Sequence, residues 1–197
     1  MLNSISRKDI FWGYASQALN IGAGVLLIPM VLFYLSTEDL GLWYIFLALV
    51  SLAQLLEFGL QPTVSRLTSY IYAGAETIHS KGLPEYTDTY FNKTLFHDLV
   101  KSAKELYFFV AIFSAILLLS LGSLYLYSLD ARVEVFYAWI LLSLSAVINF
   151  YFSYVNGLLQ GKGRQTELNR TIAISKVIMI LFTFVFLYFD MGLLSMS

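Results

Sequence analysis

The sequence predicts an all-α fold: a polytopic transmembrane helical bundle of about five spans, forming a single domain over residues 1–197. Hydrophobic residues make up 58% of the chain and charged residues 13%, with a mean hydropathy of +0.72. This composition excludes an ordinary soluble domain. The apolar residues are also gathered into stretches of about 20 residues or more, the length that crosses a bilayer core. Backbone groups in lipid must be hydrogen-bonded within the chain, so such stretches are helices rather than barrel strands.

The five predicted spans follow one another along the whole chain, at residues 10–35, 41–60, 106–128, 134–159 and 171–189. The first span has a short basic start and a long apolar run with no small-residue cleavage site, so we interpret it as a retained helix rather than a signal peptide. The second opens with Trp43 and Tyr44, which suit the membrane interface. Its helix is predicted to continue beyond the membrane, through Pro62 to about Tyr72.

A long connection over residues 74–105 is predicted to lie in the cytoplasm. Its first part, 74–90, contains glycine and proline and is interpreted as a loop. From Phe91 to Leu106 the apolar residues recur at helical spacing with lysines between them. This pattern predicts an amphipathic helix that packs beneath the bundle, or lies on the membrane surface, before it enters the third span.

Positive charge is distributed unevenly between the ends of the predicted spans. Most lysines and arginines precede the first span or lie in the second–third and fourth–fifth connections: Arg7, Lys8, Lys81, Lys93, Lys101, Lys104, Lys162, Arg164 and Arg170. The opposite connections hold acidic residues and a single positive residue, Arg132. Because cytoplasmic connections carry an excess of Lys and Arg, we expect the N-terminus in the cytoplasm and alternate connections on opposite sides.

Polar side chains form stripes along three of the spans. Residues that share a helix face by their spacing are Gly13, Ser16, Gln17, Asn20 and Gly24 in the first span, Gln54, Glu57, Gln61 and Ser65 in the second, and Ser145, Asn149, Ser153, Asn156 and Gln160 in the fourth. Polar groups in hydrocarbon usually face a bundle interior or a wet cavity, but they also join helices by hydrogen bonds. Spans one, two and four are therefore predicted to enclose a polar cavity or to be joined through these residues, while span three faces lipid.

Three charged residues lie within or near the spans. Glu57 is the only acidic residue in the interior of a predicted span, and a functional role and a buried ion pair are equally compatible with it. Lys176 lies inside the fifth span, where it needs a partner or must reach towards the cytosol. Arg66 is half a turn from Glu57 around an ideal helix, and reaching to the interface is the favoured interpretation for it.

The sequence lacks the motifs of several other classes of protein. It contains no cysteine, which excludes disulfides and thiolate metal sites, and His79 and His97 have no metal-ligand spacing. Gly161-Lys162-Gly163 lacks the spacing of a phosphate-binding loop. No catalytic acid/base cluster is present. We therefore expect no enzymatic activity, no metal or other cofactor, and no nucleic-acid partner.

Three segments resemble a known family. They are Leu40-Gly41-Leu42-Trp43-Tyr44, then Leu56-Glu57-Phe58-Gly59-Leu60 followed by Arg66, and Asn156-Gly157-Leu158-Leu159-Gln160-Gly161-Lys162-Gly163-Arg164. In this order and spacing they resemble the bacterial polysaccharide flippases (Wzx type) of the multidrug/oligosaccharidyl-lipid/polysaccharide exporter superfamily, over essentially the whole chain. The resemblance implies two pseudo-symmetric helical lobes around a central cavity that work by alternating access. Family members have many more spans, so the chain is expected to be the N-terminal lobe of a longer, MATE-like transporter in the bacterial inner membrane.

The resemblance also implies a substrate and partners. The cargo would be an undecaprenyl-pyrophosphate-linked oligosaccharide repeat unit, moved from the cytoplasmic to the periplasmic leaflet in polysaccharide or O-antigen biosynthesis. Cations would contact its pyrophosphate, with Arg66 and Lys176 as candidates, and the polar stripes would receive its sugar hydroxyls, with Gln17, Asn20, Gln54, Asn149 and Asn156 as candidates. Glu57 is the candidate for coupling or an ion pair. Membrane lipids and the polysaccharide polymerase machinery are the other expected partners.

Two alternative functions remain open at this point. A MATE-like drug or cation antiporter would share the fold, and dependence on a specific polyprenyl sugar rather than drug efflux would separate the two. A membrane scaffold without transport activity is favoured by the short chain.

Overall fold

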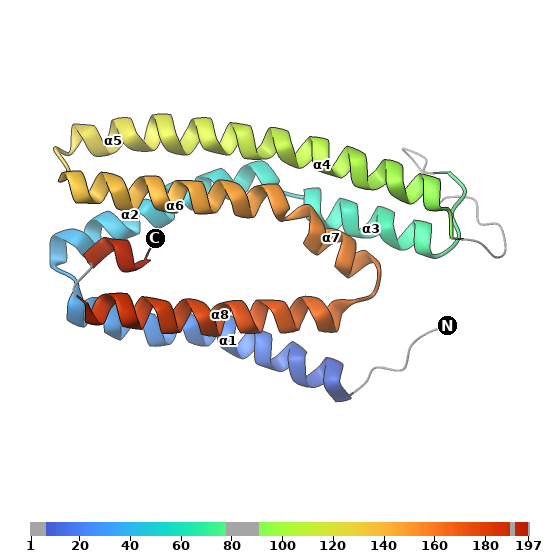
Figure 1. Cartoon of the computed structure of the whole chain (residues 1–197), viewed down its shortest axis with the longest axis horizontal. Helices are drawn as coiled ribbons and strands as arrows, with labels where there is room; N and C mark the ends of the chain where they lie inside the picture. The colour runs from blue at the N-terminus through green and yellow to red at the C-terminus, as the bar shows by residue number, and fades with distance from the viewer. Residues whose placement is uncertain (1–6, 78–90, 190–191, 197) are drawn as a thin grey trace.

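The computed structural model describes residues 7–77, 91–189 and 192–196, and those residues are almost entirely helical (Figure 1). The helices are α1 (Arg7–Tyr34), α2 (Thr37–Gln54), the 3₁₀ turn η1 (Leu55–Glu57), α3 (Leu60–Tyr72), α4 (Lys93–Ile116), the π-helical segment η2 (Leu117–Gly122), α5 (Ser123–Ser128), α6 (Val133–Phe152), α7 (Tyr154–Gly161), α8 (Gln165–Tyr188) and the 3₁₀ segment η3 (Gly192–Met196). No strand occurs in these residues, so the prediction of an all-α bundle is confirmed.

Within the described residues, five helical stretches are long and apolar enough to cross a membrane. They are Arg7–Tyr34, Thr37–Tyr72, Lys93–Ser128, Val133–Gly161 and Gln165–Tyr188, with 28, 36, 36, 29 and 24 residues. Large apolar side chains such as Phe33 and Phe58, which are 82% and 88% exposed, lie on the outside of the bundle, where lipid rather than water would contact them. The chain is a multi-pass helical membrane protein.

The span boundaries differ from the sequence prediction mainly where the helices of spans two, three and five extend beyond the predicted bounds. Residues 93–105, which the prediction placed in a connection, belong to α4, which continues without a break towards the third span. Asn92 caps this helix, since its side-chain oxygen accepts a hydrogen bond of 3.0 Å from the Leu95 amide. The amphipathic stretch from Phe91 to Leu106 is thus the start of the same helix. Residues 78–90 lie outside the described part of the chain.

The helices form two groups that lie one above the other in Figure 1. α1 packs along α8, and the α2–α3, α4–α5 and α6–α7 stretches form the larger group. α1 and α8 run in the same direction, because Asp9 accepts a hydrogen bond from Thr166, and the Arg170 guanidinium lies 5.7 Å from the Trp12 ring. The structure therefore joins the first and last long helices, with α7 connecting the two groups at one end.

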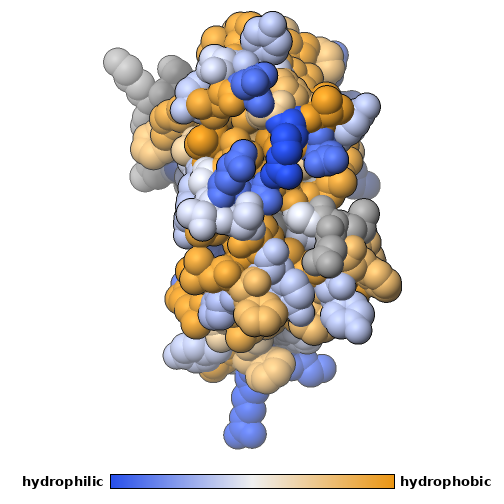
Figure 2. Space-filling view, turned by 90° about the vertical axis from the view of Figure 1, so that its left-hand side faces the viewer, coloured by the Kyte–Doolittle hydropathy of each residue, from blue (hydrophilic) through white to orange (hydrophobic). Residues whose placement is uncertain are grey.

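The connections lie at two opposite ends of the bundle. The α1–α2 and α5–α6 connections lie at the left of Figure 1, which we call the outer end, and the α7–α8 connection and the start of α1 lie at the right, the inner end. At the outer end, Arg132 forms an ion pair with Asp39, whose other carboxylate oxygen accepts a 2.9 Å hydrogen bond from Ser36. Viewed from this end, hydrophilic residues gather in one region amid hydrophobic surface (Figure 2). The single positive residue of the outer connections thus pairs with an acid of the other connection.

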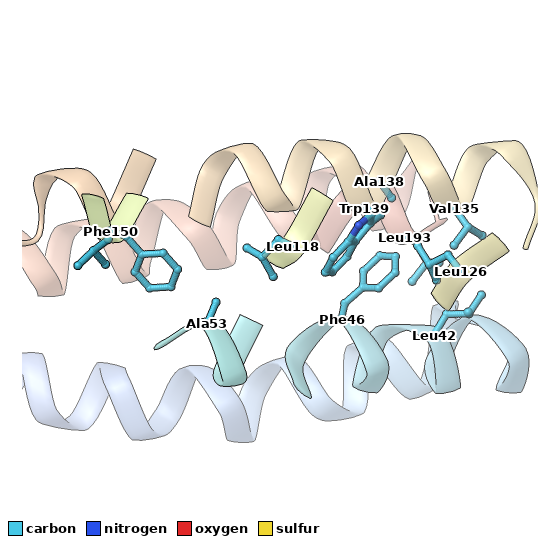
Figure 3. Close-up of a cluster of buried hydrophobic side chains, with 11 residues drawn as sticks. Leu42, Phe46, Ala53, Leu118, Leu126, Val135, Ala138, Trp139, Phe150 and Leu193 are labelled. Carbon is cyan, nitrogen blue, oxygen red and sulfur yellow. The ribbon is translucent and has the colours of Figure 1, made fainter. Parts of the chain in front are cut away.

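The main core of the larger group lies between α2, α6 and the η2–α5 stretch (Figure 3). Trp139 and Phe46 are both fully buried, with their ring centroids 5.0 Å apart. A Cβ atom at Gly122 would lie 2.2 Å from the Trp139 ring, so only glycine fits where η2 passes the indole. The extra residue per turn of a π segment and the missing side chain together make room for this ring.

The second and fourth spans are each interrupted, and the two breaks lie against each other. α2 gives way to η1, and the chain then passes Gly59 at φ 81°, a left-handed conformation that favours glycine. α6 gives way to α7 at Ser153, whose hydroxyl donates a hydrogen bond to the Glu57 carboxylate. The prediction that the second helix continues to about Tyr72 is correct in its end point. The helix is not continuous, however, because it breaks at Gly59; Pro62 occupies the first turn of α3, where proline is tolerated.

α3 and α7 pack through two glycines. A Cβ atom at Gly157 would lie 3.0 Å from the Gln61 carbonyl oxygen, and one at Gly161 would lie 2.3 Å from that of Ser65. Ser69 also donates a 3.1 Å hydrogen bond to the Gly161 carbonyl. Gly157 and Gly161 form the small-xxx-small pattern that brings helix backbones together in membranes. The segment Asn156–Arg164 therefore has a packing role in this helix bundle.

Candidate functional site

A cavity of about 780 Å³ lies between the two helix groups. It is lined by α1, α2, α6, α8 and η3, through Asn20, Ala23, Gly24, Leu27, Ile28, Val31, Leu32, Leu40, Trp43, Tyr44, Leu47, Leu141, Leu142, Ser145, Lys176, Met179, Phe182, Thr183, Phe186, Leu194 and Ser195. No described residue of the third span, α4 to α5, lines it. Its volume is in the range of small-molecule binding sites.

Three polar side chains of the cavity lie at one depth. At about 1.5 Å per helical residue, Asn20, Lys176 and Ser145 are about 18–21 Å below the outer ends of α1, α8 and α6. The parallel register of α1 and α8 also sets Asn20 beside Lys176, since Asp9 meets Thr166 and Gly13 meets Asn169 in the same offset. The cavity therefore has a polar floor near the middle of the bundle, made by three helices.

The remaining wall is almost wholly apolar. From this floor to the outer end, the cavity is bounded by side chains such as Val31, Trp43 and Phe186. Leu194 and Ser195 of η3, which lies between α8 and the larger helix group (Figure 1), also line it. Thr183 and Ser195 are hydroxyl residues there, and both are buried; Tyr44 and Trp43 add a phenol hydroxyl and an indole N–H to the wall. We call this part the apolar chamber.

Lys176 carries the only charge among the described residues that line the cavity. The side chain is half-buried, and no described carboxylate lies within ion-pair distance of it. An ammonium group in a low-dielectric site without a counter-ion is costly, which is why such groups are usually paired with an anion or mark a binding site. The chemistry of the floor is therefore suited to an anion, held by one cation and two neutral hydrogen-bonding side chains.

A second tier of predicted residues lies one turn further in. Gln17, Gln54 and Asn149 are about 24–26 Å below the outer ends of α1, α2 and α6, on the faces that carry the lining residues. All three are exposed. These three residues do not line the cavity itself. They lie at a common depth, between the polar floor and the inner end of the bundle, on the helix faces that carry the lining residues.

The other predicted residues lie elsewhere. Glu57 is half-buried at the two helix breaks, where it accepts the Ser153 hydrogen bond and interacts electrostatically with the buried Tyr107 hydroxyl of α4. Arg66 is exposed on α3, and Asn156 is half-buried on α7. These three do not border the cavity. The polar stripe of the fourth span therefore has two roles. Ser145 lines the cavity, and Ser153, nearer the inner end, joins two helices through its hydrogen bond to Glu57.

Sequence reasoning did not find the outer parts of the site. Trp43 was assigned to the membrane interface, although it lines the apolar chamber. Nothing in the local sequence marked Thr183 or η3 as part of the cavity, because their positions depend on how α8 and η3 pack against helices that are distant in sequence. For the Gly157 and Gly161 contact, the spacing of two glycines by four residues was an available signal.

Comparisons of the chain with protein-family models, with curated proteins and with solved structures found no match. The class of protein therefore follows from the helices alone: a multi-pass helical membrane protein with a cavity between two helix groups.

Proposed function

We propose that this chain forms one lobe of a transporter that moves a lipid-linked oligosaccharide from the cytoplasmic to the periplasmic leaflet of a bacterial inner membrane. The observation that carries the proposal is the unpaired Lys176 at mid-depth in a cavity of a multi-pass membrane protein. A pyrophosphate that enters a bilayer loses hydration, and a cation at mid-depth offsets part of that loss. The resemblance of the three segments to polysaccharide flippases supports the same substrate class.

The arrangement of the polar residues also supports this function. Gln17, Gln54 and Asn149 offer amide groups at one level on the inner side of Lys176, and amides can donate to and accept from sugar hydroxyls. In this proposal the oligosaccharide enters from the cytoplasmic side and its pyrophosphate lies at the polar floor. The polysaccharide polymerase machinery would receive the product on the other side.

The proposed orientation has the inner end in the cytoplasm. The start of α1 and the α7–α8 connection, which hold Arg7, Lys8, Lys162 and Arg164, lie at the same end of the bundle. The outer end carries Arg132 in an ion pair with Asp39. An excess of positive residues at the inner end is the charge distribution expected of the cytoplasmic side.

The cation antiporter is the second candidate, and the cavity does not favour it. A carboxylate is the usual counter-charge in a site for a metal ion or a cationic drug, and the described residues that line this cavity include Lys176 but no Asp or Glu. Glu57, the acid predicted for coupling, lies at the helix breaks outside it. The sign of the charge thus supports an anionic substrate.

The test is export in cells whose own copy of the gene is replaced by variants. Lys176→Gln should lower surface polysaccharide about tenfold or more, because a charge-assisted contact is lost, and lipid-linked repeat units should accumulate inside. Lys176→Arg should retain most export. Lys162→Gln is the matched control, since that lysine lies 5.5 Å from the Tyr72 ring and outside the cavity. Arg66→Gln tests the second predicted cation in the same assay. Normal export by Lys176→Gln at normal protein level would overturn the proposal.

A further inference from the structure

The apolar chamber above Lys176 raises a separate question, which is what fills it. Its described lining residues offer few hydrogen-bonding groups besides the Tyr44 hydroxyl and the Trp43 indole N–H. Thr183 and Ser195 are buried, and Ser195 already donates a 2.6 Å hydrogen bond to the Gly192 carbonyl. Ordered water requires two or more polar partners, so a chain of waters is not stable there. An empty chamber would lose the dispersion contacts of its walls. Hydrocarbon is the filling that satisfies both conditions.

The floor of the same cavity requires an anion. Lys176 has no described counter-ion, and Asn20 and Ser145 line the same cavity at about the same depth with neutral hydrogen-bonding groups. The two requirements meet in one continuous space, so the ligand that fits is one whose anionic group is joined directly to a hydrocarbon chain. A free sugar or a free phosphate satisfies one end of the cavity only.

We propose that the cavity binds a lipid phosphate with its phosphate at Lys176 and the first part of its hydrocarbon chain in the apolar chamber. This inference rests on the proposed function and deepens it, because it assigns the chamber to the lipid part of the substrate and the inner tier of amides to the sugar part. The chain then points to the outer end while the headgroup remains on the inner side. The substrate would occupy the site with its lipid chain in contact with the protein near the phosphate.

Trp43 supplies the reporter for a binding experiment. It lines the chamber, whereas Trp139 is fully buried in the core and Trp12 lies at the inner end against Arg170. The purified chain in dodecyl maltoside micelles, which contain no phosphate, is titrated with 12-bromododecyl phosphate, and tryptophan quenching by bromine is measured. 12-Bromododecanol provides the chain without the anion, and inorganic phosphate competes as the anion without the chain. Trp43→Phe removes the reporter and keeps an aromatic wall.

Two variants separate the two ends of the ligand. Lys176→Gln removes the charge, and Gly24→Leu adds a side chain at a lining position where a Cβ meets nothing within 4 Å. Gly41→Leu is the control, since a Cβ there is equally unobstructed and Gly41 does not line the cavity. Each lining variant should lower the affinity for 12-bromododecyl phosphate about tenfold, the range expected for loss of a charged hydrogen bond or of several buried methylenes.

The expected result is saturable quenching by the bromododecyl phosphate that disappears in Trp43→Phe and weakens in both lining variants but not in Gly41→Leu. Equal quenching by bromododecanol, unaffected by Lys176→Gln, would show a cavity filled by any lipid chain and overturn the inference. Displacement by inorganic phosphate with no effect of Gly24→Leu would show an anion site without a chain site, and would overturn it too. Neither result touches the export assay, so the inference and the proposed function can fail separately.

Discussion

Replacing Gly161 with alanine should destabilise the contact between α3 and α7. The new Cβ would lie 2.3 Å from the Ser65 carbonyl oxygen and 2.5 Å from the Thr68 Cβ. Both obstructing atoms are fixed, one in the backbone and one at the root of a buried side chain, so the helices must separate. Overpacking at such a contact costs up to about 3 kcal/mol. Separation also weakens the Ser69 hydrogen bond, worth about 0.6 kcal/mol between membrane helices.

Alanine also favours the helix by up to about 1 kcal/mol over glycine, which leaves a net loss of about 2–3 kcal/mol. Two other glycines calibrate the result. Gly157→Ala meets the Gln61 oxygen at 3.0 Å and should cost less, while a Cβ at Gly41 meets nothing within 4 Å and Gly41→Ala should be neutral or stabilising. The unfolding free energy in bicelles, measured by steric trapping, should rank the three variants in that order. Equal stability of Gly161→Ala and Gly41→Ala would refute the packing described here.

Three further outcomes are expected. A double-mutant cycle on Asp39 and Arg132 should give a coupling of about 0–1 kcal/mol, because the arginine side chain is 53% exposed; a coupling above about 2 kcal/mol would contradict an exposed pair. Ser153→Ala should lower the unfolding free energy by about 1 kcal/mol in the wild type and have almost no effect in a Glu57→Ala background, and additive losses would show that the two side chains do not interact. Reporter fusions in the α7–α8 connection should be cytoplasmic and those beside Arg132 periplasmic, and the reverse pattern would overturn the proposed orientation.

The spans could be predicted from the sequence because they depend on local composition. A long apolar run must form a helix in lipid, whatever surrounds it, so the number and approximate bounds of the five helices followed from hydropathy alone. The positions of the helix breaks were harder to predict from the sequence. The sequence predicted a helix that continues through Pro62, but the chain is interrupted at the left-handed residue Gly59. This break lies next to the hydrogen bond between Ser153 and Glu57, which are far apart in sequence.

The candidate site could be predicted only in part, and for the same reason. The stripe that contains Asn20 and the isolated charge of Lys176 were visible as polar residues in apolar helices, and the structure places both in one cavity. Glu57 and Asn156 belonged to similar stripes and lie elsewhere. Which polar residues join helices and which face open space depends on the pairing of distant helices, and periodicity within one helix does not contain that information.

The pairing of α1 with α8 has a consequence for the assembly of the protein during synthesis. α8 begins about 130 positions after the end of α1, so at 5–20 residues per second the ribosome needs roughly 7–26 s to complete the connecting chain. Throughout that interval α1 lacks the helix against which it packs most extensively. Its Asn20 must meanwhile face lipid, the insertion machinery or a helix that it later leaves. Biogenesis of this bundle therefore depends on keeping its first helix in the membrane until a much later one arrives.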